Sequence, residues 1–486
     1  MVIWLPIVLV LILLPLLVAV IRSLILKLKY QRRHEANPSL QKVDAIEQSA
    51  KNLAKAISFP TISRSNWAKT DFTPFHQFRA FLRETYPITF STLQVLDGGE
   101  LNILLYWEGE DKELLPALLM AHQDVVAADD EKEWCYPPFG ETIEEGYVWG
   151  RGAFDIKGQL IAILESVERL LKEGVRPQRS WYIAFGCDEE VRGDHGAVVM
   201  ANYFKAKNIT FAFVIDEGGA VAENFISFIK APVAVVGTAE KGNINISMRV
   251  TKEGGHSSSP INPTAMGLLG RAIWRVEKRT FKATLTRPVK EMLTIIGLNG
   301  SFLLSIPLLN LWLFKPLVAF FFSRNQVTNA LLRNTCAVTM AEGSSAPNVI
   351  PPYAEATVNI RLLPTQSTED GLAMLKKRVR LKEVEYTLFG GAPQSKISRT
   401  DSPEFAFIKG QIEDNFPGAL VSPYLMGGGT DALRFEPLSD NVFRFSPFQI
   451  ESQELKRIHG RDERLSVENL ERAIRFYSSL ITQSGH

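Results

Sequence analysis

Three consecutive acids, Asp188, Glu189 and Glu190, follow an apolar, strand-like run that ends at Gly186. Adjacent carboxylates at a strand end repel one another and lose hydration when they are partly buried, and a bound cation is the usual remedy. A solvated acidic turn would contain the same residues, so three acids alone do not decide between a metal site and an ordinary turn. The acids and histidines elsewhere in the chain bear on that choice.

Further imidazoles and carboxylates stand where a predicted strand ends or a glycine-rich loop begins. His122 and Asp124 lie two residues apart in an extended segment, so their side chains face the same way. An acid beside a metal-ligating histidine fixes its tautomer and raises its basicity. Each position also has an ordinary explanation, such as a hydrogen-bonded histidine or a helix N-cap. The other candidates are Asp155 in a glycine-rich loop, Asp216 at a strand end and His459 far down the chain.

The composition of the chain limits the partners and the metal ligands that it can have. Lys+Arg 54 against Asp+Glu 53 leaves a net charge of +1, which gives no indication of a nucleic-acid partner. Cys135, Cys187 and Cys336 are too few and too scattered for a disulfide framework or a thiolate metal site. Any zinc in this protein must therefore be held by His, Asp and Glu.

Strand-like and helix-like segments alternate between residues 101 and 216, and this pattern predicts an α/β fold. We expect a mixed sheet with helices on both faces, in which sites form at the carboxyl ends of strands. His122, Glu189 and Asp216 fall at such ends. After Gly242 the pattern changes, and residues 243–362 are expected to form a smaller inserted α+β domain.

The N-terminus predicts a membrane anchor. Val2–Ile21 carries no charge and is long enough to cross a bilayer as a helix, and basic residues follow it. A cleaved signal peptide would place its positive charge before the apolar run, whereas here the first basic residue, Arg22, follows it. The positive-inside rule favours a cytoplasmic domain, but large domains can be translocated against it, so the side of the membrane stays open. The expected parts are a single transmembrane anchor at 1–21, a basic tether at 22–45, a catalytic domain at 46–242 and 363–486, and the insert at 243–362.

The stretch 292–322 inside the insert is unusually apolar, and Pro307, Lys315 and Pro316 interrupt it. These interruptions argue against a second membrane span. One interpretation is an internal core or a subunit contact. The other is a surface that meets the membrane or an apolar substrate.

The segments around His122, Asp155, Glu189, Asp216 and His459, taken together in their order along the chain, resemble those of one family. It is metallopeptidase family 20, the co-catalytic zinc aminoacylases and carboxypeptidases. The resemblance covers essentially the whole chain after the tether. It is closest to the branch that includes carboxypeptidase S and the N-fatty-acyl-amino-acid hydrolases. It also extends to residues 134–139, 255–258, 348–352, 359–361 and 427–431.

The resemblance implies two Zn²⁺ per chain, for which Co²⁺ or Mn²⁺ could substitute because His/carboxylate sites discriminate poorly among divalent ions. Asp155 would bridge the two ions. His122 and Asp216 would complete one site, and Glu190 and His459 the other. Family members differ in whether they use the first or the second acid at the Asp216 position, and the branch resembled favours the first.

The resemblance also implies that the insert at 243–362 acts as a lid and dimerisation domain, and it implies roles outside the metal ligands. Glu189 matches the general base, and Asp124 matches the acid that orients His122. His256 would steady the oxyanion, within the chain or from the neighbouring subunit of a homodimer. Arg361 would grip the free carboxylate of the substrate, and Gly428 would lie in a loop that closes over it.

The implied protein is a membrane-anchored di-zinc hydrolase. It would cleave the amide bond of short peptides at their C-terminal end or of N-acyl amino acids. The alternative is a non-catalytic, membrane-anchored binding protein on a peptidase scaffold. Loss of a ligand or of the base would favour that alternative, and all five ligand positions and Glu189 are present.

Overall fold

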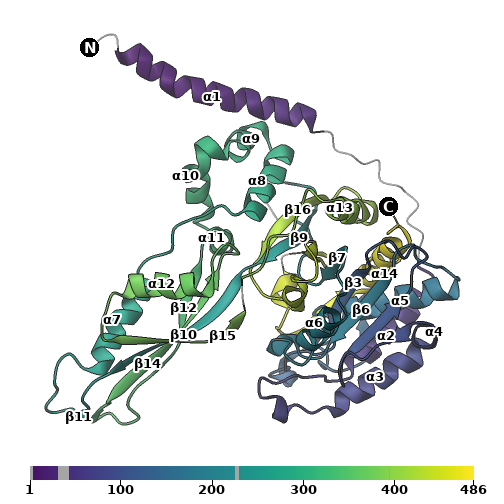
Figure 1. The fold of residues 1–486 in the computed structure, drawn as a ribbon, viewed down its shortest axis with the longest axis horizontal. Coiled ribbons are helices and arrows are strands. Elements are labelled where there is room, and N and C mark those ends of the chain that lie inside the picture. Colours follow the sequence, from purple (N-terminus) through teal and green to yellow (C-terminus); the bar gives the residue numbers. More distant parts are fainter. Residues whose placement is uncertain (1–3, 31–42, 225–228, 393, 452, 486) are drawn as a thin grey trace.

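The computed structural model of the chain describes residues 4–30, 43–224, 229–392, 394–451 and 453–485. A large sheet surrounded by helices lies on one side of the molecule, and a smaller sheet lies on the other (Figure 1). A group of apolar helices, α8 to α11, lies near the junction between them, and the N-terminal helix α1 runs across that group.

The main sheet has ten strands and is mixed, as the sequence predicts. Strand β3 pairs in parallel with both β6 and β7, whereas β2 runs antiparallel to β6. The strand order is β1 (Gln94–Val95), β2 (Ile103–Trp107), β6 (Trp181–Gly186), β3 (Ala117–His122), β7 (Phe213–Asp216), β17 (Val442–Arg444), β9 (Val233–Glu240), β8 (Val221–Ala222) and β18 (Gln449–Ile450), with β16 (Leu420–Met426) paired to β9.

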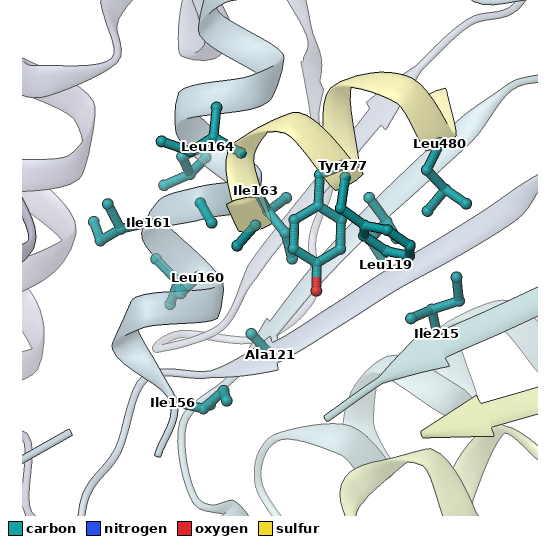
Figure 2. Packing of buried hydrophobic residues seen from close by; sticks show 14 of the residues in the cluster. Leu119, Ala121, Ile156, Leu160, Ile161, Ile163, Leu164, Ile215, Tyr477 and Leu480 are labelled. Carbon is teal, nitrogen blue, oxygen red and sulfur yellow. The ribbon is translucent and has the colours of Figure 1, made fainter. Parts of the chain in front are cut away.

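Helices cover both faces of this sheet. Successive side chains of a strand point to opposite faces, so a strand buried on both sides is apolar throughout. In β3, Leu119 and Ala121 join the core on one face and Leu118 and Met120 join the core on the other. Figure 2 shows the first of these cores, which contains Leu160, Ile163 and Leu164 of α5, Tyr477 and Leu480 of α14, Leu119 of β3 and Ile215 of β7. The helices around the sheet are α2 (Ile46–Ile57), α3 (Thr73–Thr85), α4 (Pro87–Thr92), α5 (Lys157–Lys172), α6 (Ala197–Ala206), α13 (Pro403–Asn415) and α14 (Val467–Thr482).

The second sheet is antiparallel and has four strands in the order β12 (Thr335–Glu342), β14 (Tyr353–Leu362), β10 (Gly242–Thr251) and β15 (Val384–Ala392). Its buried face packs on α7 (Ala265–Glu277) and α12 (Thr368–Val379). Both α12 and β15 lie beyond residue 362, where the sequence places the end of the insert. The second unit therefore extends to Ala392, because β15 pairs along β10.

The apolar stretch 292–322 contributes to a core. It belongs to α8 (Arg287–Asn299), α9 (Phe302–Leu309) and α10 (Leu311–Phe322), which are followed by α11 (Gln326–Leu332). Leu293 and Ile296 pack with Leu420 and Leu425 of β16. The other face of the group carries exposed apolar side chains.

Helix α1 spans Trp4–Lys29, so it takes in most of the expected anchor and the first part of the expected tether. Residues 1–3 and 31–42, and the side chains of residues 4–10 and 12, lie outside the described part of the chain. Across the described residues, no single helix is apolar over the length that a membrane span requires. The pair α9 and α10, bent by 107° at its break, passes that test jointly, by length and composition alone.

A buried ion network ties the junction of the two units to the main sheet. The Arg444 guanidinium, fully buried, donates to Glu240 Oε1 at 2.6 Å and to Glu436 Oε1 at 2.8 Å. Glu240 ends β9, just before the chain enters β10, and its carboxylate also accepts from the Thr430 hydroxyl at 2.7 Å. One guanidinium therefore forms ion pairs with two buried carboxylates at the point where the chain leaves the main sheet.

Replacing this guanidinium should be costly. Arg444→Leu leaves Glu240 and Glu436 buried without a counter-charge, and removing one partner of a buried pair costs about 3–5 kcal/mol. We expect a loss of that size in the free energy of unfolding, measured by denaturant titration. The control is Arg399→Leu, whose exposed partner is Asp401, and it should cost under about 1 kcal/mol. Equal losses in the two variants would contradict the assigned importance of the network.

Candidate metal centre

The candidate site lies at the carboxyl end of the main sheet. His122 is the last residue of β3, and Glu189 and Glu190 stand in the turn η3 (Glu189–Val191) that follows β6. Glu217 follows the last residue of β7. Two loops complete the group, since Asp155 precedes α5 and His459 precedes the short strand β19 (Arg464–Ser466). As the sequence predicts, residues far apart in the chain meet where parallel strands end.

Asp155 faces both imidazoles. Its Oδ1 lies 3.2 Å from His122 Nε2, and its Oδ2 lies 3.1 Å from His459 Nε2. Each histidine nitrogen also faces a second carboxylate: Glu217 Oε1 lies 3.2 Å from His122 Nε2, and Glu190 Oε2 lies 3.3 Å from His459 Nε2. The result is two donor groups that share Asp155, and nitrogen and carboxylate donors of this kind suit zinc.

The position beside His122 belongs to Glu217 and not to Asp216, the residue that the sequence favours. The two side chains diverge where β7 ends. Asp216 Oδ2 accepts from the backbone N–H of Ala432 at 2.7 Å, whereas Glu217 reaches His122. His122, Glu189 and Glu217 form a group whose potential ligand atoms lie within 4.8 Å of one another.

The charges of the cluster fit a bound cation. Glu190 Oε1 is buried and has no hydrogen-bond partner among the described residues. Burial, followed by the nearby carboxylates, raises the pKa of Glu217 to about 8. Hydrogen bonds to Asp155 and Glu190 raise the pKa of His459 to about 10. Without a cation, protons therefore compensate the crowded carboxylates at the positions that a metal ion would take.

Asp124 supports this cluster from outside the cavity. It is fully buried, and its carboxylate accepts from the backbone N–H groups of Glu189 and Glu190, both at 3.1 Å. The Ser63 hydroxyl donates to it at 2.5 Å. His122 Nδ1 lies 2.9 Å from the Asp124 carbonyl oxygen and 3.4 Å from its carboxylate. Asp124 thus holds both the His122 ring and the turn that carries the two glutamates.

Glu463 is a supporting residue for which the sequence predicts no role, although it lies four residues after His459. Its Oε1 accepts from the backbone N–H groups of Gly152, Phe154 and Asp155, each at 3.0 Å. Its Oε2 pairs with Arg151 at 2.6 Å. Acid and loop are more than three hundred residues apart in the chain, so no local pattern could reveal the contact.

Asp188, the third acid of the opening triplet, also has a structural task. Its Oδ2 accepts from the backbone N–H of His195 at 2.8 Å, and this hydrogen bond ties the turn after β6 to the segment that leads into α6. Burial raises the pKa of Asp188. The triplet therefore divides into one residue that fixes the loop and two that face the site.

A cavity of about 390 Å³ opens over the cluster. Its polar wall contains Asp155, Glu189, Glu190, Glu217 and His459. Gly428 is also among the residues that line it. The remaining wall includes Thr430 and Ser446 but is largely apolar, with side chains from Phe154, Ile156, Met426, Ile450, Leu455 and Ile458.

Two predicted substrate-binding residues lie elsewhere. His256 is exposed on β11 (Gly255–His256), which pairs with β13 (Val349–Ile350) at the far tip of the second unit (Figure 1). Arg361 is partly buried on β14 and lies opposite Asn243 of β10. In the described part of the chain, no carboxylate forms an ion pair with Arg361. Neither residue lines the cavity within one chain.

The Glu463 contacts predict a loss of metal affinity. Glu463→Ala leaves three backbone N–H groups and Arg151 without their acceptor, which frees the loop that positions Asp155. We expect zinc affinity, measured by competition with a chelator, to fall by about 10–100-fold. Glu463→Gln, which keeps an acceptor oxygen, should lose less, and Glu468→Ala on the exposed face of α14 should lose nothing. Unchanged affinity in Glu463→Ala would show that the loop is positioned without Glu463.

Comparisons with known proteins agree with this arrangement. Residues 118–483 match the peptidase family M20/M25/M40. The chain is 36% identical over 442 residues to the N-fatty-acyl-amino acid synthase/hydrolase PM20D1 of Xenopus tropicalis, which covers 90% of this chain and 86% of the relative. It is 37% identical over 441 residues to the probable carboxypeptidase S-like 2 of Dictyostelium discoideum, covering 89% of this chain and 84% of the relative.

The fold also matches solved structures. The M20 family metallo-carboxypeptidase Sso-CP2 of Sulfolobus solfataricus superposes with a TM-score of 0.67 at 18% identity, covering 90% of this chain and 99% of that one. The predicted family and the predicted enzyme class are thereby confirmed. This chain belongs to peptidase family M20/M25/M40, and it is a hydrolase.

Proposed function

We propose that this protein is a membrane-anchored di-zinc hydrolase that cleaves the amide bond next to an amino acid with a free α-carboxylate. The observation that carries the proposal is Asp155, whose two oxygens face His122 and His459 on the floor of a cavity that Glu189 also lines. Short peptides and N-acyl amino acids both contain such a bond. The relatives named above include a carboxypeptidase S-like protein and an N-fatty-acyl-amino acid synthase/hydrolase.

In the proposed site, His122, Asp155 and Glu217 hold one ion, and Glu190, Asp155 and His459 hold the other. Glu217 takes the role first expected for Asp216, because only Glu217 contacts His122. Zinc, when bound, supplies a Lewis acid and lowers the pKa of a coordinated water to about 7. Cobalt or manganese could occupy the same donors.

Glu189 is the proposed proton carrier. It lines the cavity beside the ligand Glu190, but its own carboxylate faces Glu217 and His122. Burial and the neighbouring Glu217 raise its pKa well above the ordinary value. A carboxylate with a raised pKa accepts a proton from the attacking water more readily, and it can then return that proton to the leaving amine nitrogen.

Recognition of the substrate is proposed to use both units. Arg361 carries a cation without a carboxylate partner in the described structure, and Lys241 lies near it. These cations suit a substrate carboxylate. The apolar wall of the cavity suits an acyl chain or an apolar side chain. His256 stands on the distant tip of the second unit, which supports a role in the cavity of a neighbouring subunit in a homodimer.

The two acids after β7 can be separated by metal content. Glu217→Ala removes a donor that contacts His122, so we expect about one zinc equivalent per chain to be lost on dialysis. Asp216→Asn keeps an oxygen for the Ala432 N–H and should retain both equivalents. Metal counting by mass spectrometry on the two proteins checks this. The reverse pattern would restore Asp216 as the ligand.

The reaction itself is tested by Glu189→Gln on a substrate panel of N-oleoyl amino acids and Gly-Leu-type dipeptides. We expect kcat to fall by about 10²–10⁴-fold with zinc content unchanged, because the amide cannot carry the proton. The exposed Glu451→Gln is the matched control and should retain full activity. The apolar wall predicts faster turnover of the N-oleoyl substrates by the unaltered protein. If the unaltered protein hydrolyses neither class of substrate, the proposed reaction is wrong.

A further inference from the structure

The outer face of the helices α9 and α10 is apolar and uncovered. Leu303 is 80% exposed, Trp312 59% and Phe321 56%, although the opposite side of the same helices packs into a core. Helix α1 lies against α9 (Figure 1) and continues this surface, because its own leucine and isoleucine side chains are exposed as well. The exposed apolar residues of α1 are Leu11, Leu13, Leu14, Leu16, Leu17, Val18, Ile21, Leu24, Ile25 and Leu28.

Polar contacts fix α1 to α9. The buried Asn310 side chain donates to the Ala19 carbonyl oxygen at 3.0 Å and to the Ser23 hydroxyl at 2.8 Å. Lys27 Nζ donates to Ser305 Oγ at 3.2 Å and to the Gly300 carbonyl oxygen. Polar groups in an apolar contact are costly unless they are paired, so these bonds specify one register between the helices. The second half of α1 and the α9–α10 pair therefore form a single unit.

The charge of this unit has one sign. Residues 1–34 and residues 292–341 contain no Asp or Glu. The basic residues in these two stretches are Arg22, Lys27, Lys29, Arg32, Arg33, Lys315, Arg324 and Arg333. A second copy of the same face would bring like charges together, which disfavours self-association. The phosphate groups of a lipid surface would instead attract them.

We infer that the second half of α1 and the outer face of α9 and α10 form one surface that is seated in a phospholipid bilayer. Its apolar side chains enter the acyl region, and its exposed residues Lys29, Trp312, Lys315 and Arg324 lie at the headgroups, where amphipathic rings and long cationic side chains are stable. The sharp bend of 107° between α9 and α10 suits a shallow, re-entrant contact rather than a second span.

This inference rests on the proposed membrane anchor and goes beyond it. An anchor alone would let the catalytic domain rotate on its tether, whereas a seated α9–α10 surface gives the domain one orientation. Helix α8 connects that surface to the site, because it packs on β16, and the last residue of β16, Met426, lines the cavity. The orientation of that surface therefore also sets the orientation of the strand that ends at the cavity.

Site-directed spin labelling of the full-length protein in phosphatidylcholine/phosphatidylglycerol vesicles tests the contact. Labels are placed one at a time with Leu303→Cys on α9, Phe320→Cys on α10 and Val18→Cys on α1, in a Cys135→Ser, Cys336→Ser background. Trp274→Cys on α7 is the matched control, since Trp274 is also aromatic and is 57% exposed. Collision rates with dissolved oxygen and with a water-soluble nickel chelate report the depth of each label.

We expect the labels at 303, 320 and 18 to favour oxygen over the chelate by several-fold, and the label at 274 to favour the chelate. A lipid-buried label at 18 with chelate-accessible labels at 303 and 320 would overturn the inference and leave the anchor intact. Chelate access at all four positions would overturn both. Zinc content and hydrolysis by the same samples report on the catalytic proposal independently, because none of these residues lines the cavity.

Discussion

The structure depends on bringing several carboxylates into one small, poorly hydrated space. Asp155, Glu189, Glu190 and Glu217 repel one another there, and two imidazoles alone do not balance their charge. Such a cluster is stable only when protons or cations neutralise it. This constraint explains why the site is assembled from strand ends and loops of a rigid sheet. A flexible scaffold would relieve the repulsion by moving the carboxylates apart.

Support for the cluster comes from acids that never face the cavity. Asp124 holds the turn after β6, and Glu463 holds the loop before α5. Each carboxylate does so by accepting hydrogen bonds from backbone N–H groups. In both cases a buried carboxylate replaces the backbone partners that an irregular loop lacks. Arg444 has a similar role with the opposite charge, because it pairs with two buried acids where the chain leaves the main sheet. Positioning and charge compensation are thus performed by the same side chains.

Much of this could be predicted from the sequence, because the end of a buried strand is a local pattern. That His122, Asp155 and His459 meet was implied by the family resemblance, and their side chains do lie together. The choice between Asp216 and Glu217 was not predictable, since it depends on how the chain turns after its last strand residue. The pairing of β15 with β10 was not predictable for a related reason, because alternation identifies a strand but not its neighbour. The contacts of Glu463 are set by the tertiary fold alone.

The second unit has a further consequence for folding. About one third of the chain lies between Asn243 and Ala392, yet these two residues face each other on the paired strands β10 and β15. Once the small sheet forms, the chain enters and leaves the second unit at neighbouring positions. For the main domain, the second unit is then equivalent to a short connection between the segments that flank Asn243 and Ala392. The entropic cost of closing so long a loop is then met when the second unit folds, and it does not add to the cost of folding the main domain. The two units can therefore fold separately, and the main sheet can gain β16 and β17 without waiting for distant chain ends to find each other.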